Sequence, residues 1–260
     1  ALAHPTPGST TRLLLGDQET ARKHFLRSAE LSRRRGVIQE EFMALIGSTS
    51  ISFQLGELEE AERLLNQLEN YPRRMPNAAT SQVEIDIFRA VLYSMRGEVD
   101  VALPLLRKHA DHARQRGDLQ TLSNLLSALS DIMLEMIRQD GLKDEGEVEQ
   151  NLQEYLSLAQ RGQGSLSAAY ANLALLRTLQ QRFEEAAQAI TAGRQAQEPR
   201  YVLRDLLLDI AEIELAAHDG HLEAALAGYE ALQGKSLQTS RWHQARLDTS
   251  YAEVLMQRGE

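Results

Sequence analysis

Residues 55–61, Leu55-Gly56-Glu57-Leu58-Glu59-Glu60-Ala61, contain a pattern that recurs along the chain. The pattern is a Gly, an apolar residue two positions later and an Ala five positions later. It stands again at Gly97/Val99/Ala102 and at Gly220/Leu222/Ala225. Looser copies are Gly16/Ala21, which lacks the apolar residue, and Gln181/Phe183/Ala186, which has Gln in place of Gly.

The copies follow one another at a nearly constant interval. With Gly141 and Gly259 added, the anchors lie at 16, 56, 97, 141, 181, 220 and 259, so the steps are 40, 41, 44, 40, 39 and 39 residues. A steady period of this length is typical of stacked copies of one supersecondary unit. The sequence therefore predicts a single repeat domain over residues 1–260.

Each anchor separates two segments with the apolar spacing of helices. A Gly directly after a helix adopts the left-handed conformation that ends it without steric cost. Acidic residues such as Glu57, Glu59 and Glu60 then suit the first turn of the next helix. The repeat unit is thus a helix A, a tight turn and a helix B, and the fold class is all-α. The predicted pairs of A and B helices are 10–15, a remnant, with 17–35, 37–55 with 57–70, 80–96 with 98–116, 118–140 with 147–161, 165–180 with 183–197, and 200–218 with 221–233. The last A helix, 240–258, is unpaired.

The repeat resembles the tetratricopeptide repeat (TPR), whose helical hairpin carries a similar Gly-to-Ala turn. Ala90 and Tyr93 match the small and aromatic positions of its helix A. The resemblance implies a right-handed α-solenoid superhelix of about six helical hairpins. The early Trp of helix A is absent, and the period of about 40 also fits HEAT or armadillo units, against 34 for the standard TPR. The large helix-B residue of the family is matched by Phe25, Leu65, Leu106, Ile190 and Tyr229.

Composition limits the classes of function. The 28 basic residues are outnumbered by 37 acidic ones, giving a net charge of −9, so we expect no nucleic-acid binding. The chain has no Cys, which excludes thiolate chemistry. No apolar run is long enough for a membrane span and no signal peptide is evident, so the expected location is cytoplasmic, without membrane attachment.

No arrangement of residues indicates catalysis. Gly234-Lys235-Ser236 resembles the end of a phosphate-binding loop, but the required earlier Gly is Tyr229. His109 and His112 lack a third ligand at matched spacing. We therefore predict a protein that is not an enzyme, with no cofactor and no metal.

The TPR resemblance places four helix-A positions, at thirteen, ten, six and three residues before the turn, on the concave inner face. This surface is apolar with scattered carboxylates. It lacks the Lys and Asn residues with which chaperone-binding TPR proteins hold a C-terminal carboxylate. A neutral or basic peptide, a partner helix or a small-molecule inducer fits this groove better. The candidate binding residues are Glu84, Ile87, Val91, Asp131, Glu135, Leu175, Ile210, Glu214 and Arg246.

The long, irregular repeats are similar to the sensor arms of bacterial signal-transducing NTPases of the STAND type, such as the maltose-regulon activators. This similarity implies a ligand- or protein-sensing domain of a larger bacterial regulator. The alternative is a passive scaffold for complex assembly, without a switch. The last predicted A helix lacks a B partner, so we expect a longer chain or self-association through Leu247, Val254 and Leu255.

Overall fold

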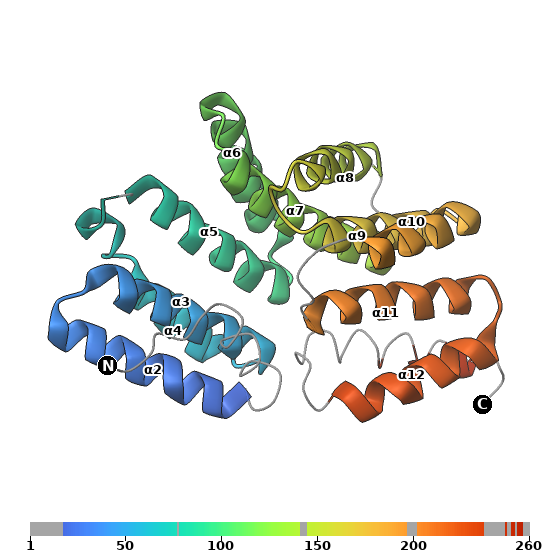
Figure 1. Cartoon of the computed structure of the whole chain (residues 1–260), viewed down its shortest axis with the longest axis horizontal. Helices are drawn as coiled ribbons and strands as arrows, with labels where there is room; N and C mark the ends of the chain where they lie inside the picture. The colour runs from blue at the N-terminus through green and yellow to red at the C-terminus, as the bar shows by residue number, and fades with distance from the viewer. Residues whose placement is uncertain are drawn as a thin grey trace. The chain divides into compact units, whose positions relative to one another are not determined.

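The computed structural model describes residues 18–76, 78–140, 145–196, 202–236, 248, 251–252 and 254–256. Within these ranges the protein is helical and contains no strand, so the predicted all-α class is confirmed for them. The chain divides into two compact units, and each is coloured along the sequence in Figure 1. Unit 1 comprises Ala1–Gly97 with Lys235–Arg246, and unit 2 comprises Glu98–Gly234 with Leu247–Glu260.

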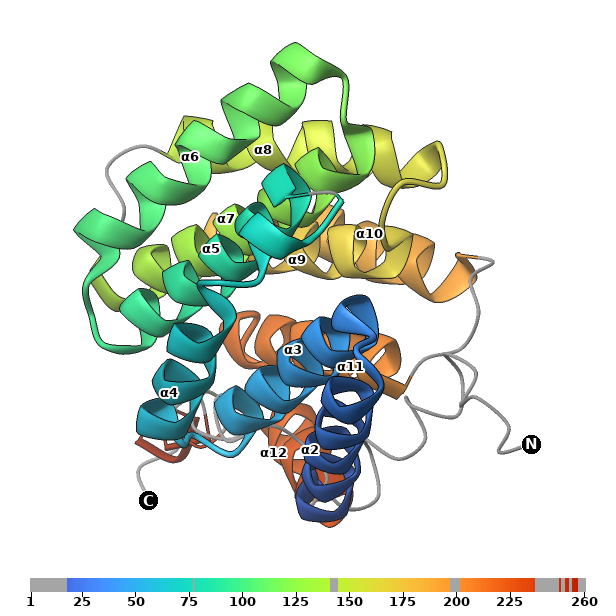
Figure 2. The ribbon, with the colours of Figure 1, turned by 90° about the vertical axis from the view of Figure 1, so that its left-hand side faces the viewer.

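In unit 1 the helices pack in chain order. Helix α3 packs against both α2 and α4, and α5 packs against α4 and the short 3-10 helix η1. Figure 2 shows α2 lying along α3. The bounds are α2 Gln18–Arg35, α3 Ile38–Gln54, α4 Leu58–Leu68, η1 Pro72–Arg74 and α5 Ala78–Met95.

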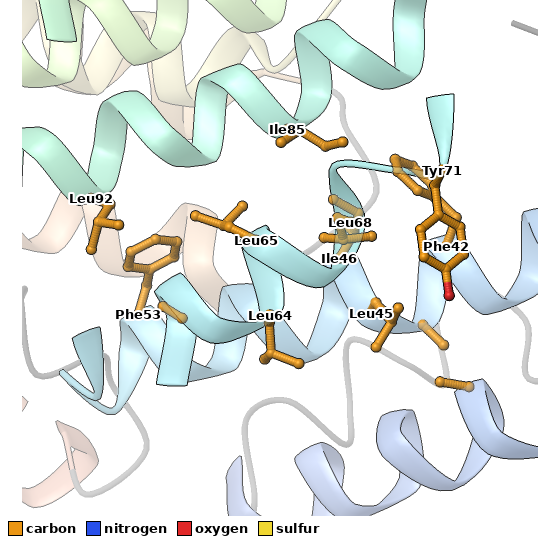
Figure 3. Packing of buried hydrophobic residues seen from close by; sticks show 13 residues of the cluster. Phe42, Leu45, Ile46, Phe53, Leu64, Leu65, Leu68, Tyr71, Ile85 and Leu92 are labelled. Atoms are coloured by element: carbon orange, nitrogen blue, oxygen red, sulfur yellow. The ribbon is translucent and has the colours of Figure 1, made fainter. Parts of the chain in front are cut away.

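A hydrophobic core joins these helices of unit 1 (Figure 3). Leu64, Leu65 and Leu68 of α4 are fully buried between residues of α3 and α5. Phe53 of α3 stacks on Phe88 of α5, with ring centroids 6.0 Å apart. Burial of this apolar surface, rather than helix propensity alone, stabilises the short helix α4.

Unit 2 continues the same order of packing. Helix α6 packs against α7, α7 against α8, and α9 against both α8 and α10. The A helices also contact one another, α7 with α9 and α9 with α11. The bounds are α6 Val99–Arg116, α7 Leu119–Asp140, α8 Glu145–Gln160, α9 Leu166–Leu179, α10 Phe183–Gln195, α11 Val202–His218 and α12 Leu222–Ser236.

The turns between helices A and B have the left-handed backbone that the motif requires. Gly56, Gly97 and Gly220 have φ of 67°, 80° and 82°. Gln181, which replaces Gly, has φ of 60° and is the one non-Gly residue with positive φ in the described parts of the chain. The anchors Gly16, Gly141 and Gly259 lie outside the described residues.

The helix-B residues of the motif are buried. The Ala five positions after the turn is at most 2% exposed at Ala21, Ala61, Ala102, Ala186 and Ala225. The large residue four positions further on is buried at Leu65, Leu106, Ile190 and Tyr229 and half-buried at Phe25. A side chain no larger than a methyl group therefore stands where each B helix meets its neighbours.

Two ion pairs connect B helices one repeat apart. Arg107 and Arg114 of α6 bind Glu147 and Glu154 of α8, with N–O distances of 2.6 and 2.7 Å. Both arginines donate from two nitrogens. The members of each pair are 40 residues apart in sequence, the same spacing as the motif.

The repeat pattern predicted that Val254 would be left uncovered at the C-terminal end, and for this residue the prediction is wrong. Val254 is 1% exposed and belongs to a core cluster with Leu226, Tyr229 and Leu232 of α12. The ring of Tyr251 lies edge-on to Tyr229, with centroids 5.4 Å apart. Residues of this C-terminal segment thus pack on α12, which the repeat pattern did not anticipate. Leu255 is half-buried, and Leu247 lies outside the described residues.

Candidate functional site

The most polar part of the predicted inner face in unit 2 lies on three neighbouring A helices. Helices α7 and α11 both pack against α9. We call the positions thirteen, ten, six and three residues before each turn the A-helix face. On α7 they are Ala128, Asp131, Glu135 and Arg138, on α9 Ala168, Ala171, Leu175 and Thr178, and on α11 Leu207, Ile210, Glu214 and Ala217.

A buried ion pair connects α7 and α11 on the A-helix face. Nη2 of Arg138 lies 2.5 Å from Oε2 of Glu214, and the side chains are 15% and 4% exposed. The two residues are 76 positions apart in sequence. The ion pair thus joins two helices that both pack against α9.

A second polar contact connects α7 and α9. Nδ2 of Asn172 donates a hydrogen bond of 2.6 Å to Oδ1 of the exposed Asp131. The buried Asn172 lies outside the four positions from which the face was predicted. The sequence signal that could have found it is the 41-residue separation from Asp131, close to one repeat.

Two polar atoms on this face are buried without a hydrogen-bond partner. Oε1 of Glu135 accepts a bond of 2.8 Å from Nε2 of Gln139, but Oε2 of Glu135 is buried and has no partner in the described part of unit 2. Oγ1 of Thr178, a residue that is 1% exposed, is also buried and has no hydrogen-bond partner among the described residues. A buried acceptor without a donor is energetically unfavourable. Both atoms could accept hydrogen bonds from a bound group once the side chains that cover them move aside.

The predicted apolar contacts of unit 2 are core residues. Ile210 is 1% exposed and packs in the cluster that includes Leu226 and Tyr229 of α12. Leu175 is 2% exposed. Both residues stabilise the helix packing in this structure, which corrects the expectation that they form an accessible apolar surface. Arg246 lies outside the described residues.

The candidates of unit 1 lie on α5. Glu84, Ile87 and Val91 are all half-buried. Burial raises the pKa of the Glu84 carboxyl above its ordinary range, because the charged form loses hydration. Met43 on α3, at a corresponding inner-face position, is exposed.

The described residues show no group of three or more His, Asp or Glu side chains that could hold a metal ion. Among them, none of the helices combines the length and apolar character of a membrane span.

Comparisons with models of protein families, with curated proteins and with solved structures found no match.

Proposed function

We propose that this protein is a binding domain whose ligand contacts the A-helix face of unit 2. The observation that carries the proposal is the buried carboxylate oxygen Oε2 of Glu135. No group donates a hydrogen bond to it in the described part of unit 2. A carboxylate in this situation gains more from a ligand donor than an exposed one does, because its hydration is already lost.

The ligand chemistry follows from the groups on the face. Glu135 and Thr178 offer acceptor oxygens, while Arg138 and Glu214 already neutralise each other. An ammonium, amide or hydroxyl group would satisfy the two acceptors, whereas an anion would be repelled by Glu135 and Asp131. A basic or neutral peptide, or a small ligand with an amino group, therefore fits best.

Binding rather than catalysis is the proposed role. In the described residues of this face, no hydroxyl is hydrogen-bonded to a base as a nucleophile would require. The proposal also includes a TPR-like solenoid acting as the sensor of a larger STAND-type regulator, in the cytoplasm. There, ligand binding would shift the populations of two states. A passive scaffold is the alternative, and it would bind a partner without any shift between states.

The test is a binding titration with a fluorescein-labelled amphipathic peptide built of Lys and Leu. Glu135→Gln and Thr178→Val should each weaken binding, because they remove an acceptor while preserving shape. Glu59→Gln and Glu184→Gln, on exposed B-helix surfaces, are matched controls. Glu214 is unsuitable for this purpose, since its substitution would break the ion pair with Arg138 and disturb the helix packing as well. If the A-helix variants and the B-helix controls changed peptide affinity equally, the A-helix face would be excluded as the binding site.

A further inference from the structure

A cluster of five arginines lies at one end of unit 1, although the protein as a whole is acidic. Arg33, Arg34 and Arg35 form the last turn of α2, and their side chains are 62%, 68% and 64% exposed. Arg73 and Arg74 belong to η1 and are also exposed. We call these five residues the basic cluster.

Buried contacts connect the two parts of the basic cluster. Nε of Arg33 lies 2.6 Å from Oε1 of Glu41, a residue 3% exposed. The hydroxyl of Tyr71 donates a hydrogen bond of 2.5 Å to the same oxygen. The guanidinium of Arg74 lies over the Tyr71 ring, 5.7 Å from its centroid. The end of α2 and η1 are therefore held next to each other by Glu41 and Tyr71.

The short helix η1 is a rigid support for its arginines. Pro72 is its first residue, and Pro76 follows directly after its C-cap, Met75. Proline fixes φ, and the residue before it is restricted as well. Tyr71 and Pro72 are buried, which anchors the segment. Little backbone entropy is lost when a partner binds to side chains held in this way.

The carboxylates around the cluster do not neutralise it. Glu30 is shared between Arg34 and the neighbouring Arg27, and the Glu40 carboxylate lies 3.9 Å from Arg35. The side chain of Arg73 has no ion pair or hydrogen bond with any of the described residues. The five arginines thus face three carboxylates, Glu30, Glu40 and the buried Glu41, in a chain whose net charge is −9. This local excess of positive charge runs against the charge of the whole protein.

We propose that the basic cluster binds an acidic peptide segment of a protein partner, with an apolar residue beside its carboxylates. Leu31 is 43% exposed and stands three and four residues before Arg34 and Arg35, hence on the same side of α2. It offers the apolar contact. A long polyanion such as nucleic acid is disfavoured, because it would also meet the acidic remainder of the surface. The acidic segment is a different ligand from the amino-bearing one of the A-helix face.

Arginines at a helix C-terminus also have a purely local role, since they suit the helix dipole. Helix α6 supplies the matched control, because it too ends on an arginine, Arg116, directly before the left-handed Gly117. Arg116→Glu and Arg35→Glu therefore change the charge and the helix end in the same way. Only Arg35 belongs to the basic cluster.

The experiment measures fluorescence anisotropy of a labelled peptide of Glu and Leu, about twelve residues long, against the full chain. The double variant Arg35→Glu/Arg73→Glu should weaken binding about tenfold or more, through loss of two attractive contacts and gain of two repulsive ones. Arg116→Glu should stay within about twofold. Added salt should weaken binding, and the Gln/Leu counterpart of the peptide should bind poorly.

Several outcomes would overturn the proposal. They are equal losses in Arg116→Glu and Arg35→Glu, indifference to salt, failure of the Glu/Leu peptide to bind, or tighter binding of a single-stranded RNA. Self-association of the free protein that disappears in Arg35→Glu would instead assign the cluster to a second copy of the chain. The Lys/Leu peptide separates this proposal from the one above, because its binding should respond to Glu135→Gln and not to Arg73→Glu.

Discussion

Arg138 of α7 and Glu214 of α11 form a buried ion pair although 76 residues separate them. Removing one partner of such a pair leaves the remaining charge with less compensation, whereas removing both does not. The contact therefore couples the two outer helices of the α7, α9 and α11 group. Both residues also interact with groups beyond this pair, so the coupling extends further.

A double-mutant cycle measures this coupling. Arg138→Met and Glu214→Gln are each expected to lower the free energy of unfolding by about 3 kcal/mol. The double variant Arg138→Met/Glu214→Gln should lose less than the sum of the two single losses. Urea unfolding provides the values. Arg194→Met, which breaks the more exposed pair with Asp209, should cost at most about 1 kcal/mol. Additive losses in the cycle would contradict the coupling.

The hydrogen bond from Tyr71 to Glu41 gives a second prediction. Tyr71→Phe leaves the buried Glu41 carboxylate with one donor fewer, so the free energy of unfolding should fall by about 1–3 kcal/mol. Tyr93→Phe, at a half-buried position of α5, is the control and should change stability by at most about 0.5 kcal/mol. Thermal or urea unfolding distinguishes the two. A silent Tyr71→Phe would mean that Glu41 is held by Arg33 alone.

The motif Ala of helix B should tolerate no larger side chain. Ala186 is fully buried and the adjacent Ala187 is exposed, so the two form a matched pair on α10. Ala186→Leu should destabilise by about 1–3 kcal/mol through overpacking, while Ala187→Leu should be nearly neutral. Ala61→Leu and Ala102→Leu should behave like Ala186→Leu. Neutral results at all three buried positions would show that the B helices do not pack closely there.

The left-handed Gln181 predicts a stabilising substitution. A residue with a Cβ is strained at φ of 60°, whereas Gly is not. Gln181→Gly should therefore raise the free energy of unfolding by about 1 kcal/mol. The reverse exchange at an equivalent turn, Gly97→Gln, should lower it by a similar amount, because the space around Gly97 is open and only backbone strain acts. Urea unfolding should show changes in the free energy of unfolding of opposite sign for the two variants. Changes of the same sign would contradict the role of backbone strain.

The raised pKa of Glu84 predicts a stability that depends on pH. Because burial disfavours the charged form, ionised Glu84 destabilises the folded state at pH values above both its folded and unfolded pKa. Below the unfolded pKa the carboxyl is protonated in both states and the effect disappears. Glu84→Gln should therefore stabilise the protein near about pH 7, with the gain vanishing toward about pH 4. A gain of equal size at both pH values would exclude titration of Glu84 as its cause.

The helices were predictable because their boundaries depend on local chemistry. The Gly residues at 56, 97 and 220, and the Ala five positions later, determine where one helix ends and the next one packs. The pairing of Arg138 with Glu214 was not predictable, since it depends on the distance across a third helix. The burial of Ile210 was also missed, because the same apolar residue suits a binding surface and a core.

The two ion pairs between α6 and α8 influence how neighbouring repeats align. Arg107 and Arg114 are seven residues apart, as are Glu147 and Glu154, and this distance is close to two helical turns. Sliding one helix by one turn would break both pairs, and sliding it by two turns would keep only one. Exposed pairs of this kind add at most about 1 kcal/mol each. Their main consequence is selection of the correct register during folding, because hairpins of similar sequence can otherwise stack in a shifted register.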